Sequence, residues 1–293
     1  MFYKPSINEE TFPILEVGPG ALPFLLSDIW LDIKFDERTR FAQSGNSKPA
    51  VGKPIVYYDG KRFPFKDKAF KYVIASHVLE HVSWEDVPLF ISEMERVSDA
   101  GYIELPRWTW ELINDIPTHK LTGDVKDGRL ILYKKTCGHD YNFFTKILIE
   151  KSRNFREYIE KEKGLYFCKF EWQKKILFEA HENGYPIDGG KSEIISILKK
   201  DCENLVFEGS TPGSLIVNEL QNKTRNFIDK IINHYKIRFN RFAPEKDRKH
   251  IGGSQMPNFL QCPICQNSIG KNLKCEKCGF YFKKMGFEYN PHV

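Results

Sequence analysis

The sequence predicts a doubly wound α/β sheet, an α+β extension and a small cysteine-rich module at the C-terminus. Three observations support this fold class. Over residues 12–107, short apolar runs alternate with helical or loop segments, which is typical of a mainly parallel sheet. After Pro106 the pattern changes to hairpin-like and helical segments. Four of the seven cysteines of the 293-residue chain lie in its last 32 residues.

The first part of the chain predicts five strands and one helix. Trp84–Val97 is expected to be helical because its apolar residues recur on one stripe. The strands are expected at Thr11–Gly20, where the strand ends in a glycine turn, and at Asp28–Ile33, Pro54–Tyr58, Ala69–Ser76 and Gly101–Leu105.

The extension combines a hairpin, helices and a further pair of strands. Lys126–Arg129 is a turn between two extended runs, which indicates a hairpin. Helices are expected at Tyr141–Glu162 and Leu215–Phe242, and a second pair of strands at Leu165–Trp172 and Lys175–His181. A polar linker follows, so the expected domains are residues 1–125, 126–245 and 256–293.

Composition excludes several classes of protein. Hydrophobic residues make up 41% of the chain and aromatic residues 14%, which excludes intrinsic disorder as its main character. We find no apolar stretch of the ~18 residues that a membrane helix needs, and no secretory signal at the start. The cysteines do not form a disulfide framework spread over a secreted domain, so a reduced, cytoplasmic location is expected.

The net charge of +5 is unevenly distributed. From Leu220 to Val293 the chain carries 14 Lys and Arg against 5 Asp and Glu. This basic segment could face RNA or an anionic lipid surface, or it could simply be a soluble lysine-rich segment.

The glycine turn and the acids that follow it suggest a nucleoside-type ligand. Gly18 and Gly20 follow the first strand, where glycines let backbone N–H groups approach a ligand. Asp32 comes 16 residues after Glu16 and can accept both hydrogen bonds of a ribose diol. Asp59-Gly60 closes the third strand, where the carboxylate can accept from an adenine amine. A structural turn and capping acids are the alternative.

These residues resemble class I S-adenosylmethionine-dependent methyltransferases. The likeness covers residues 12–107 and is carried above all by Phe63–Val82, which follows a pattern written LPF-x-D-x-SFD-x-V-x-x-x-x-x-LEH. The resemblance implies a Rossmann-like methyltransferase sheet and S-adenosylmethionine as cofactor. Lys71 and Ala69 depart from the pattern, but both lie at the start of the expected strand. Ala21 departs from it in the glycine turn.

The resemblance also implies roles for individual residues. It implies Glu16, Gly18 and Gly20 around the methionine part of the cofactor, and Asp32 on the ribose hydroxyls. The remaining implied contacts are Asp59 and Gly60 near the adenine, and Ser76 and His77 facing the methyl group.

His77-Val78-Leu79-Glu80-His81 also fits H-x-x-E-H, an inverted zinc-protease pattern. Two histidines at i and i+4 of a helix could bind zinc, with the glutamate as base. That site needs a long helix, whereas His77 follows directly on a strand-like run. We therefore expect Glu80 to be a first-turn acid and His81 an ordinary helix histidine.

Catalytic candidates are residues expected at the carboxyl end of the sheet. Methyl transfer from a sulfonium is an in-line displacement, and a base is needed only for a hydroxyl or a protonated amine. His77 and Glu104 are the leading candidates; the others are Arg107, Trp108, Trp110, His119 and Lys120.

The C-terminal cysteines predict a metal site. Cys262, Cys265, Cys275 and Cys278 form C-x2-C-x9-C-x2-C, the spacing of a structural Zn²⁺ site with four thiolates. Iron is the chemical alternative. This tail resembles the zinc ribbon of small activator subunits of methyltransferases, although Phe282–Pro291 departs from that family. The ribbon could cap its own core, dock a partner or hold a substrate backbone.

Together these features predict a cytoplasmic methyltransferase with a C-terminal zinc ribbon. The expected acceptor is a hydroxyl or amine of a glycan or small metabolite, ahead of RNA, with residues 126–245 on the acceptor side. The alternative is a non-catalytic adapter of the same fold, whose zinc ribbon binds a partner protein or RNA.

Overall fold

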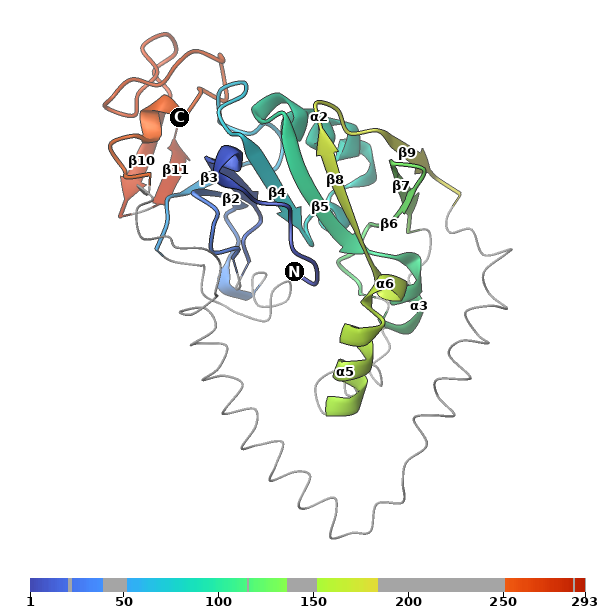
Figure 1. Ribbon diagram of the computed structural model, residues 1–293. Helices are drawn as coiled ribbons and strands as arrows, with labels where there is room; N and C mark the ends of the chain where they lie inside the picture. Colours follow the sequence, from blue (N-terminus) through green and yellow to red (C-terminus); the bar gives the residue numbers. More distant parts are fainter. Residues whose placement is uncertain are drawn as a thin grey trace, which may run out of the picture.

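An eight-stranded sheet forms the centre of the computed structural model (Figure 1). The structure describes residues 1–20, 23–38, 52–114, 116–135, 152–183, 251–286 and 288–292. The strands of this sheet follow the order β10-β11-β3-β2-β1-β4-β5-β8. Their bounds are β1 Ile14–Val17, β2 Ile29–Ile33, β3 Ile55–Tyr58, β4 Tyr72–Ser76, β5 Ala100–Pro106, β8 Phe167–Gln173, β10 Tyr281–Met285 and β11 Glu288–His292.

The five central strands confirm the predicted fold class. Strands β3, β2, β1, β4 and β5 are all parallel. The chain moves outward in one direction from β1 to β3 and then returns to the other side of β1 with β4, which is the doubly wound arrangement. Each of the five strands that the sequence predicts is present, and β1 to β4 are mostly buried, as parallel strands covered on both faces should be.

The prediction that Leu165–Trp172 and Lys175–His181 pair with each other is wrong. Both strands exist, but β8 lies antiparallel to β5 in the main sheet, whereas β9 (Phe178–His181) pairs with β7. Strands β6 (Leu121–Lys126) and β7 (Arg129–Lys134) form the predicted hairpin, and β9 lies beside β7 as the third strand of this second sheet. Alternation in β8 buries Phe170 and Trp172 and exposes Lys169, Glu171 and Gln173, which suits an edge strand of the main sheet.

The helical segments of the described chain are short. Predicted helix Trp84–Val97 is present as a 3₁₀ turn followed by helix α2, and predicted helix Tyr141–Glu162 is described from residue 152 onward, where it contains α5. Predicted helix Leu215–Phe242 lies outside the described residues. The bounds are η1 Glu9–Thr11, η2 Leu79–His81, η3 Trp84–Asp86, α2 Val87–Val97, α3 Trp108–Asn114, α5 Arg153–Lys161, α6 Lys163–Tyr166 and η5 Met256–Asn258.

The C-terminal module extends the central sheet instead of standing apart from it. Strands β10 and β11 form an antiparallel hairpin, and β11 pairs in parallel with β3 through Glu288↔Ile55 and Tyr289↔Val56. Figure 1 shows this hairpin beside β3, at the edge of the sheet opposite β8. The module thereby covers an edge whose unpaired backbone groups would otherwise be open to other chains.

A shared apolar core joins the module to the sheet. The Phe70 and Phe259 rings stack with centroids 5.5 Å apart, and Lys66 N donates to Phe259 O at 2.8 Å. Gln261 N donates to Pro64 O at 3.0 Å. Cys262, Cys275 and Tyr289 belong to the same buried cluster as the central strands. The module therefore caps its own core, one of the three arrangements that the sequence left open.

Candidate functional site

The strand order reverses between β1 and β4, and a doubly wound sheet opens a crevice at the carboxyl ends of these strands. The glycine turn follows β1, and Ser76-His77 ends β4 and enters the next turn. Asp32 lies near the end of β2, beside β1. The fold thus brings these predicted residues to one edge of the sheet.

The glycine turn has the backbone that only glycine adopts easily. Gly18 has φ +61° and Gly20 has φ +57°. Gly18 N donates to Leu31 O at 2.7 Å, which fixes the turn against β2. A Cβ on Gly18 would lie 2.6 Å from Val78 Cγ2, whereas the only contact of a Cβ on Gly20 within the described part of the chain would be Gly18 O, at 4.0 Å. Among the described residues, no side chain lies within 4 Å of that Cβ position, so none of them blocks a ligand at Gly20.

Glu16 lies beneath this turn and is buried. Its carboxylate accepts from Phe24 N at 2.9 and 3.0 Å and from Ser27 Oγ at 2.8 Å. Burial raises the pKa of Glu16 to about 7, although these hydrogen bonds oppose the shift. Glu16 therefore ties the segment after the glycine turn to β1, which shapes the place where the resemblance puts the methionine part of a cofactor.

The two acids predicted on the nucleoside differ in their surroundings. Asp32 is buried, and its Oδ1 accepts from Ile33 N at 2.9 Å. Asp59 is exposed, and its Oδ1 accepts from Lys61 N at 3.0 Å. Gly60, with φ +85°, completes that turn. Asp59 thus caps its own turn, which is the alternative role that the sequence pattern suggests for this acid. The capping contact uses Oδ1 and leaves Oδ2 for a ligand.

His77 joins the ends of β4 and β5. Its backbone is left-handed, with φ +57°, and its N donates to Glu104 O at 2.8 Å. Such a conformation in a non-glycine residue often accompanies function. The ring lies between two carboxylates, with Nδ1 3.0 Å from Glu80 Oε1 and Nε2 3.1 Å from Glu104 Oε1. The second contact has ion-pair distance without hydrogen-bond geometry.

The two carboxylates determine the charge of His77. Burial opposes the charged form, but Glu104 and Glu80 outweigh it and raise the pKa of His77 to about 9. Burial likewise opposes ionisation of Glu104, but His77 outweighs it and holds the pKa of this carboxyl at about 2. Near neutral pH the pair is therefore an imidazolium and a carboxylate.

Glu104 is fully buried, and the start of the chain covers it. Its carboxylate accepts from Phe2 N at 2.8 Å, Tyr3 N at 3.0 Å and Ser76 Oγ at 3.2 Å, and from the Tyr102 hydroxyl. These contacts leave little room for a substrate at its oxygens. The Phe2 ring packs edge-on against His77 with centroids 5.7 Å apart. No signal in the sequence points to Phe2 or Tyr3, because these contacts span more than 100 residues of chain.

The other predicted candidates lie in separate contacts. Arg107 pairs with Asp124 at 2.9 Å, and Trp108 and Trp110 are buried. His119 is buried, with Nδ1 2.6 Å from Glu111 Oε1. Trp108, Trp110 and His119 are therefore packed within the fold, Arg107 is partly exposed, and none of these contacts brings them to His77.

The structure does not provide the helix that the H-x-x-E-H pattern needs. His77 is left-handed, and only Leu79–His81 follows as a single 3₁₀ turn. His77 and His81 therefore do not share the face of an α-helix. Instead, His81 lies against His119, with ring centroids 4.9 Å apart.

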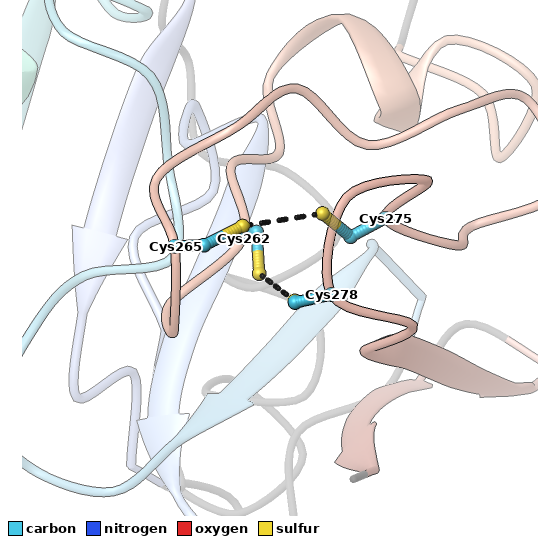
Figure 2. Close-up of side chains that lie close together, drawn as sticks. All are labelled: Cys262, Cys265, Cys275 and Cys278. Carbon is cyan, nitrogen blue, oxygen red and sulfur yellow. Dashed lines mark hydrogen bonds between the residues drawn. The ribbon is translucent and has the colours of Figure 1, made fainter.

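The four C-terminal cysteines converge (Figure 2). Cys262 Sγ lies 3.4 Å from Cys278 Sγ, and Cys265 Sγ lies 3.4 Å from Cys275 Sγ. All four sulfurs lie within 4.8 Å of one another, and all four cysteines are free of disulfides. Zinc–sulfur bonds of about 2.3 Å place tetrahedral sulfurs about 3.8 Å apart, so this set fits one zinc ion.

A family match agrees with the doubly wound core. Residues 26–103 match the family described as a methyltransferase domain (Methyltransf_11). The matched residues include Asp32, Asp59 and His77 but begin after the glycine turn. The match supports methyl transfer in general and does not identify an acceptor. No curated protein matches the chain.

Several solved structures are similar at low identity. The PH0226 protein from Pyrococcus horikoshii OT3 is 16% identical, with 55% of this chain and 81% of that chain covered and a TM-score of 0.32. An S-adenosylmethionine dependent methyltransferase from Mesorhizobium loti is 11% identical, with 55% and 89% covered and a TM-score of 0.28. The complex of the Haloferax volcanii Trm112 methyltransferase activator with a putative methyltransferase is 12% identical, with 57% and 84% covered and a TM-score of 0.30. All three scores are below 0.5, so these likenesses carry no argument about function.

Among the described residues, no helix has the length and apolar character needed to cross a membrane. Most Lys and Arg residues of the basic segment from Leu220 to Val293 lie outside the described residues, so its predicted contact with RNA stays a prediction.

Proposed function

We propose that this protein is an S-adenosylmethionine-dependent methyltransferase. The observation that carries the proposal is the left-handed turn at Gly18 and Gly20, which opens beside the reversal of strand order and is followed by the buried Asp32. This is where a doubly wound sheet takes its ligand. The match of residues 26–103 to a methyltransferase domain supports the same chemistry.

Each residue of the crevice then has a defined task. Gly18 and Gly20 bring backbone N–H groups to the methionine part of the cofactor, and Glu16 holds the segment behind them. The carboxylate of Asp32 accepts from the ribose hydroxyls. Asp59 and Gly60 lie near the adenine, and Ser76 and His77 face the methyl group. The bound cofactor supplies an electrophilic methyl carbon on a sulfonium.

We propose His77 and Glu104 as the charged pair on the methyl side of the site. Because the pKa of His77 is raised to about 9, His77 is protonated near neutral pH and does not act as a general base in this arrangement. Its task is to donate hydrogen bonds and to balance charge, and Glu104 positions it. Because His77 does not serve as the base, an acceptor amine that is already neutral, or a hydroxyl activated by another group, suits the site. A glycan or small metabolite stays our preferred acceptor, ahead of RNA.

We further propose that the four cysteines hold a structural zinc ion. Four thiolates complete a tetrahedral site and leave no position for a substrate. The task of the ion is to hold together the two Cys-x2-Cys knuckles, Cys262–Cys265 and Cys275–Cys278, so that the β10–β11 hairpin can pair with β3. We place the protein in the cytoplasm, because thiolate sites persist in reducing compartments.

Calorimetric titration with S-adenosylmethionine tests the proposal. Wild-type protein should bind one equivalent in the micromolar range, and Asp32→Ala should weaken binding at least about tenfold, by removing the acceptor for two hydroxyls. Asp86→Ala is the matched control, because Asp86 is exposed and its side chain makes no capping bond.

If the wild-type protein does not bind S-adenosylmethionine, the enzyme proposal is wrong. The alternative is then the non-catalytic adapter, whose zinc ribbon binds a partner protein or RNA. Binding to mixed RNA should fall steeply as salt rises if RNA is the acceptor, and a flat response would exclude RNA.

A further inference from the structure

A second cluster of metal-ligating side chains lies beside the crevice, apart from the four cysteines. Glu80 and His81 come from the 3₁₀ turn after β4, and His119 comes from the segment before β6. One ligand atom from each of these three residues lies within 4.8 Å of the other two. The sequence pattern predicts only ordinary helix roles for Glu80 and His81, and it places His119 far from them along the chain.

Each histidine of this cluster is oriented through Nδ1. His81 Nδ1 lies 3.2 Å from the carbonyl oxygen of Thr118, and His119 Nδ1 lies 2.6 Å from Glu111 Oε1. Lys135 Nζ in turn donates to Glu111 Oε2 at 2.8 Å. With Nδ1 engaged, Nε2 of each ring remains to bind an ion. Metal-binding histidines are usually held in this way, by a carboxylate or a carbonyl on the other nitrogen.

The carboxylate of the cluster carries an unsatisfied oxygen. Glu80 is 0% exposed, and its Oε1 contacts His77 Nδ1. Its Oε2 is buried and has no hydrogen-bond partner among the described residues. A buried carboxylate oxygen without a partner is costly, and a bound cation removes that cost.

We propose that Glu80, His81 and His119 bind one divalent transition-metal ion. Two imidazoles and one carboxylate favour ions such as Zn²⁺ or Co²⁺ over Mg²⁺ and Ca²⁺, which prefer oxygen ligands. Bonds of about 2.1 Å place two ligands of one ion at most about 4.2 Å apart, so the cluster needs only a small contraction to close on an ion. Three protein ligands leave at least one coordination position open.

The location of this site suggests what the open position is for. Glu80 contacts His77, which follows directly on the end of β4. If methyl transfer takes place there, an acceptor hydroxyl oxygen can occupy the open position, where the ion lowers the pKa of the hydroxyl so that its proton passes to solvent water. The oxygen would then attack the methyl carbon as the carbon–sulfur bond breaks, and S-adenosylhomocysteine would leave. This consequence rests on the proposed function, whereas metal binding does not.

Titration of the full chain with Co²⁺ tests the site. The protein is first loaded with one equivalent of Zn²⁺ to fill the four-cysteine site, and binding of Co²⁺ is then followed by calorimetry. We expect one further equivalent in the wild-type protein and at least about a tenfold loss of affinity in His119→Ala. His181→Ala is the matched control, because His181 is half exposed and contacts only Glu179 and Tyr133 among the described side chains.

A second variant and a competing ion make the result decisive. His81→Ala should lose Co²⁺ as His119→Ala does, and thermal unfolding of each variant shows whether it is folded. Equal competition by Mg²⁺ at the same concentration would contradict the proposed class of ion. Absence of a second equivalent in the zinc-loaded wild type, or unchanged Co²⁺ affinity in both folded variants, would overturn the proposal. Each readout is metal binding, so the result stands whether or not methyl transfer is observed.

Discussion

Gly18 lies directly against Val78, so close that a Cβ on Gly18 would be 2.6 Å from Val78 Cγ2. This contact joins the turn after β1 to the segment after β4, the two strands between which the sheet order reverses. The glycine is therefore required twice, once for its left-handed backbone and once for the close approach.

We predict that Gly18→Ala weakens binding of S-adenosylmethionine at least about tenfold. A Cβ at φ +61° costs about 1–2 kcal/mol, and the clash with Val78 adds to it. Calorimetry measures the affinity. Gly128→Ala is the control, because Gly128 has φ +71° but a Cβ added there would meet no described residue within 4 Å. Adding Val78→Ala to Gly18→Ala should recover part of the loss, and no recovery would mean that the contact is unimportant.

The C-terminal hairpin should depend on zinc. In Cys275→Ser we expect loss of bound zinc and at least about a 100-fold fall in amide-exchange protection at Tyr289, because the knuckles no longer hold β11 against β3. Cys168→Ser is the control and should retain zinc, since Cys168 is buried beside Leu105 O and lies outside the cluster. Full protection at Tyr289 in zinc-free protein would contradict this role.

Glu16 should make the stability of the protein depend on pH. Its pKa is raised from 4.5 to about 7 in the folded state, so the folded state retains a proton that the unfolded state has lost. The free energy of unfolding should therefore fall as pH rises from about 4.5 to about 7, by an amount on the order of 3 kcal/mol from this group. Glu16→Gln should flatten the profile in this window when unfolding by urea is measured. Parallel profiles for the two proteins would show that Glu16 does not titrate here.

Arg96 should stabilise the loop on which the C-terminal module packs. Its guanidinium donates to Glu93 at 2.6 and 2.8 Å, to Phe65 O at 2.7 Å and to Phe63 O at 2.8 Å, and it pairs with Asp67. Because Glu93 is buried, Arg96→Ala should cost about 3 kcal/mol in urea unfolding.

Arg153→Ala is the control for this prediction. Arg153 makes an exposed pair with Glu157 at 2.6 Å, and its removal should cost less than about 1 kcal/mol. An equal loss of unfolding free energy in Arg96→Ala and Arg153→Ala would mean that burial of the Arg96–Glu93 pair does not increase its contribution to stability. Exchange at the amide of Lys66, which donates to Phe259 O, should rise in Arg96→Ala alone.

Local patterns were sufficient for the central strands and for the cysteine site. Apolar runs such as Ile14–Val17 and Tyr72–Ser76 become buried parallel strands because such runs have no other stable place in a doubly wound sheet. The two C-x2-C knuckles converge because each points two thiolates at a common centre. The three domain boundaries stay predictions, and the predicted roles of the crevice residues stay proposals.

The pairing of distant segments could not be predicted in the same way. Strands β8 and β9 are separated by a short turn, and proximity in sequence suggests that they pair, yet β8 joins β5 and β9 joins β7. Which edge a strand joins depends on the apolar face it must bury, and that face exists only once the sheet has formed.

The sequence by itself determined the doubly wound sheet, the glycine turn with its following acid, and the four-cysteine site, because each depends on short-range spacing. Only the tertiary structure decided three further features. It placed Phe2 and Tyr3 on the buried carboxylate of Glu104, brought His119 to Glu80 and His81, and paired β11 with β3. The physical reason is that buried charges and sheet edges must find partners wherever the fold supplies them, and these partners lie far away along the chain.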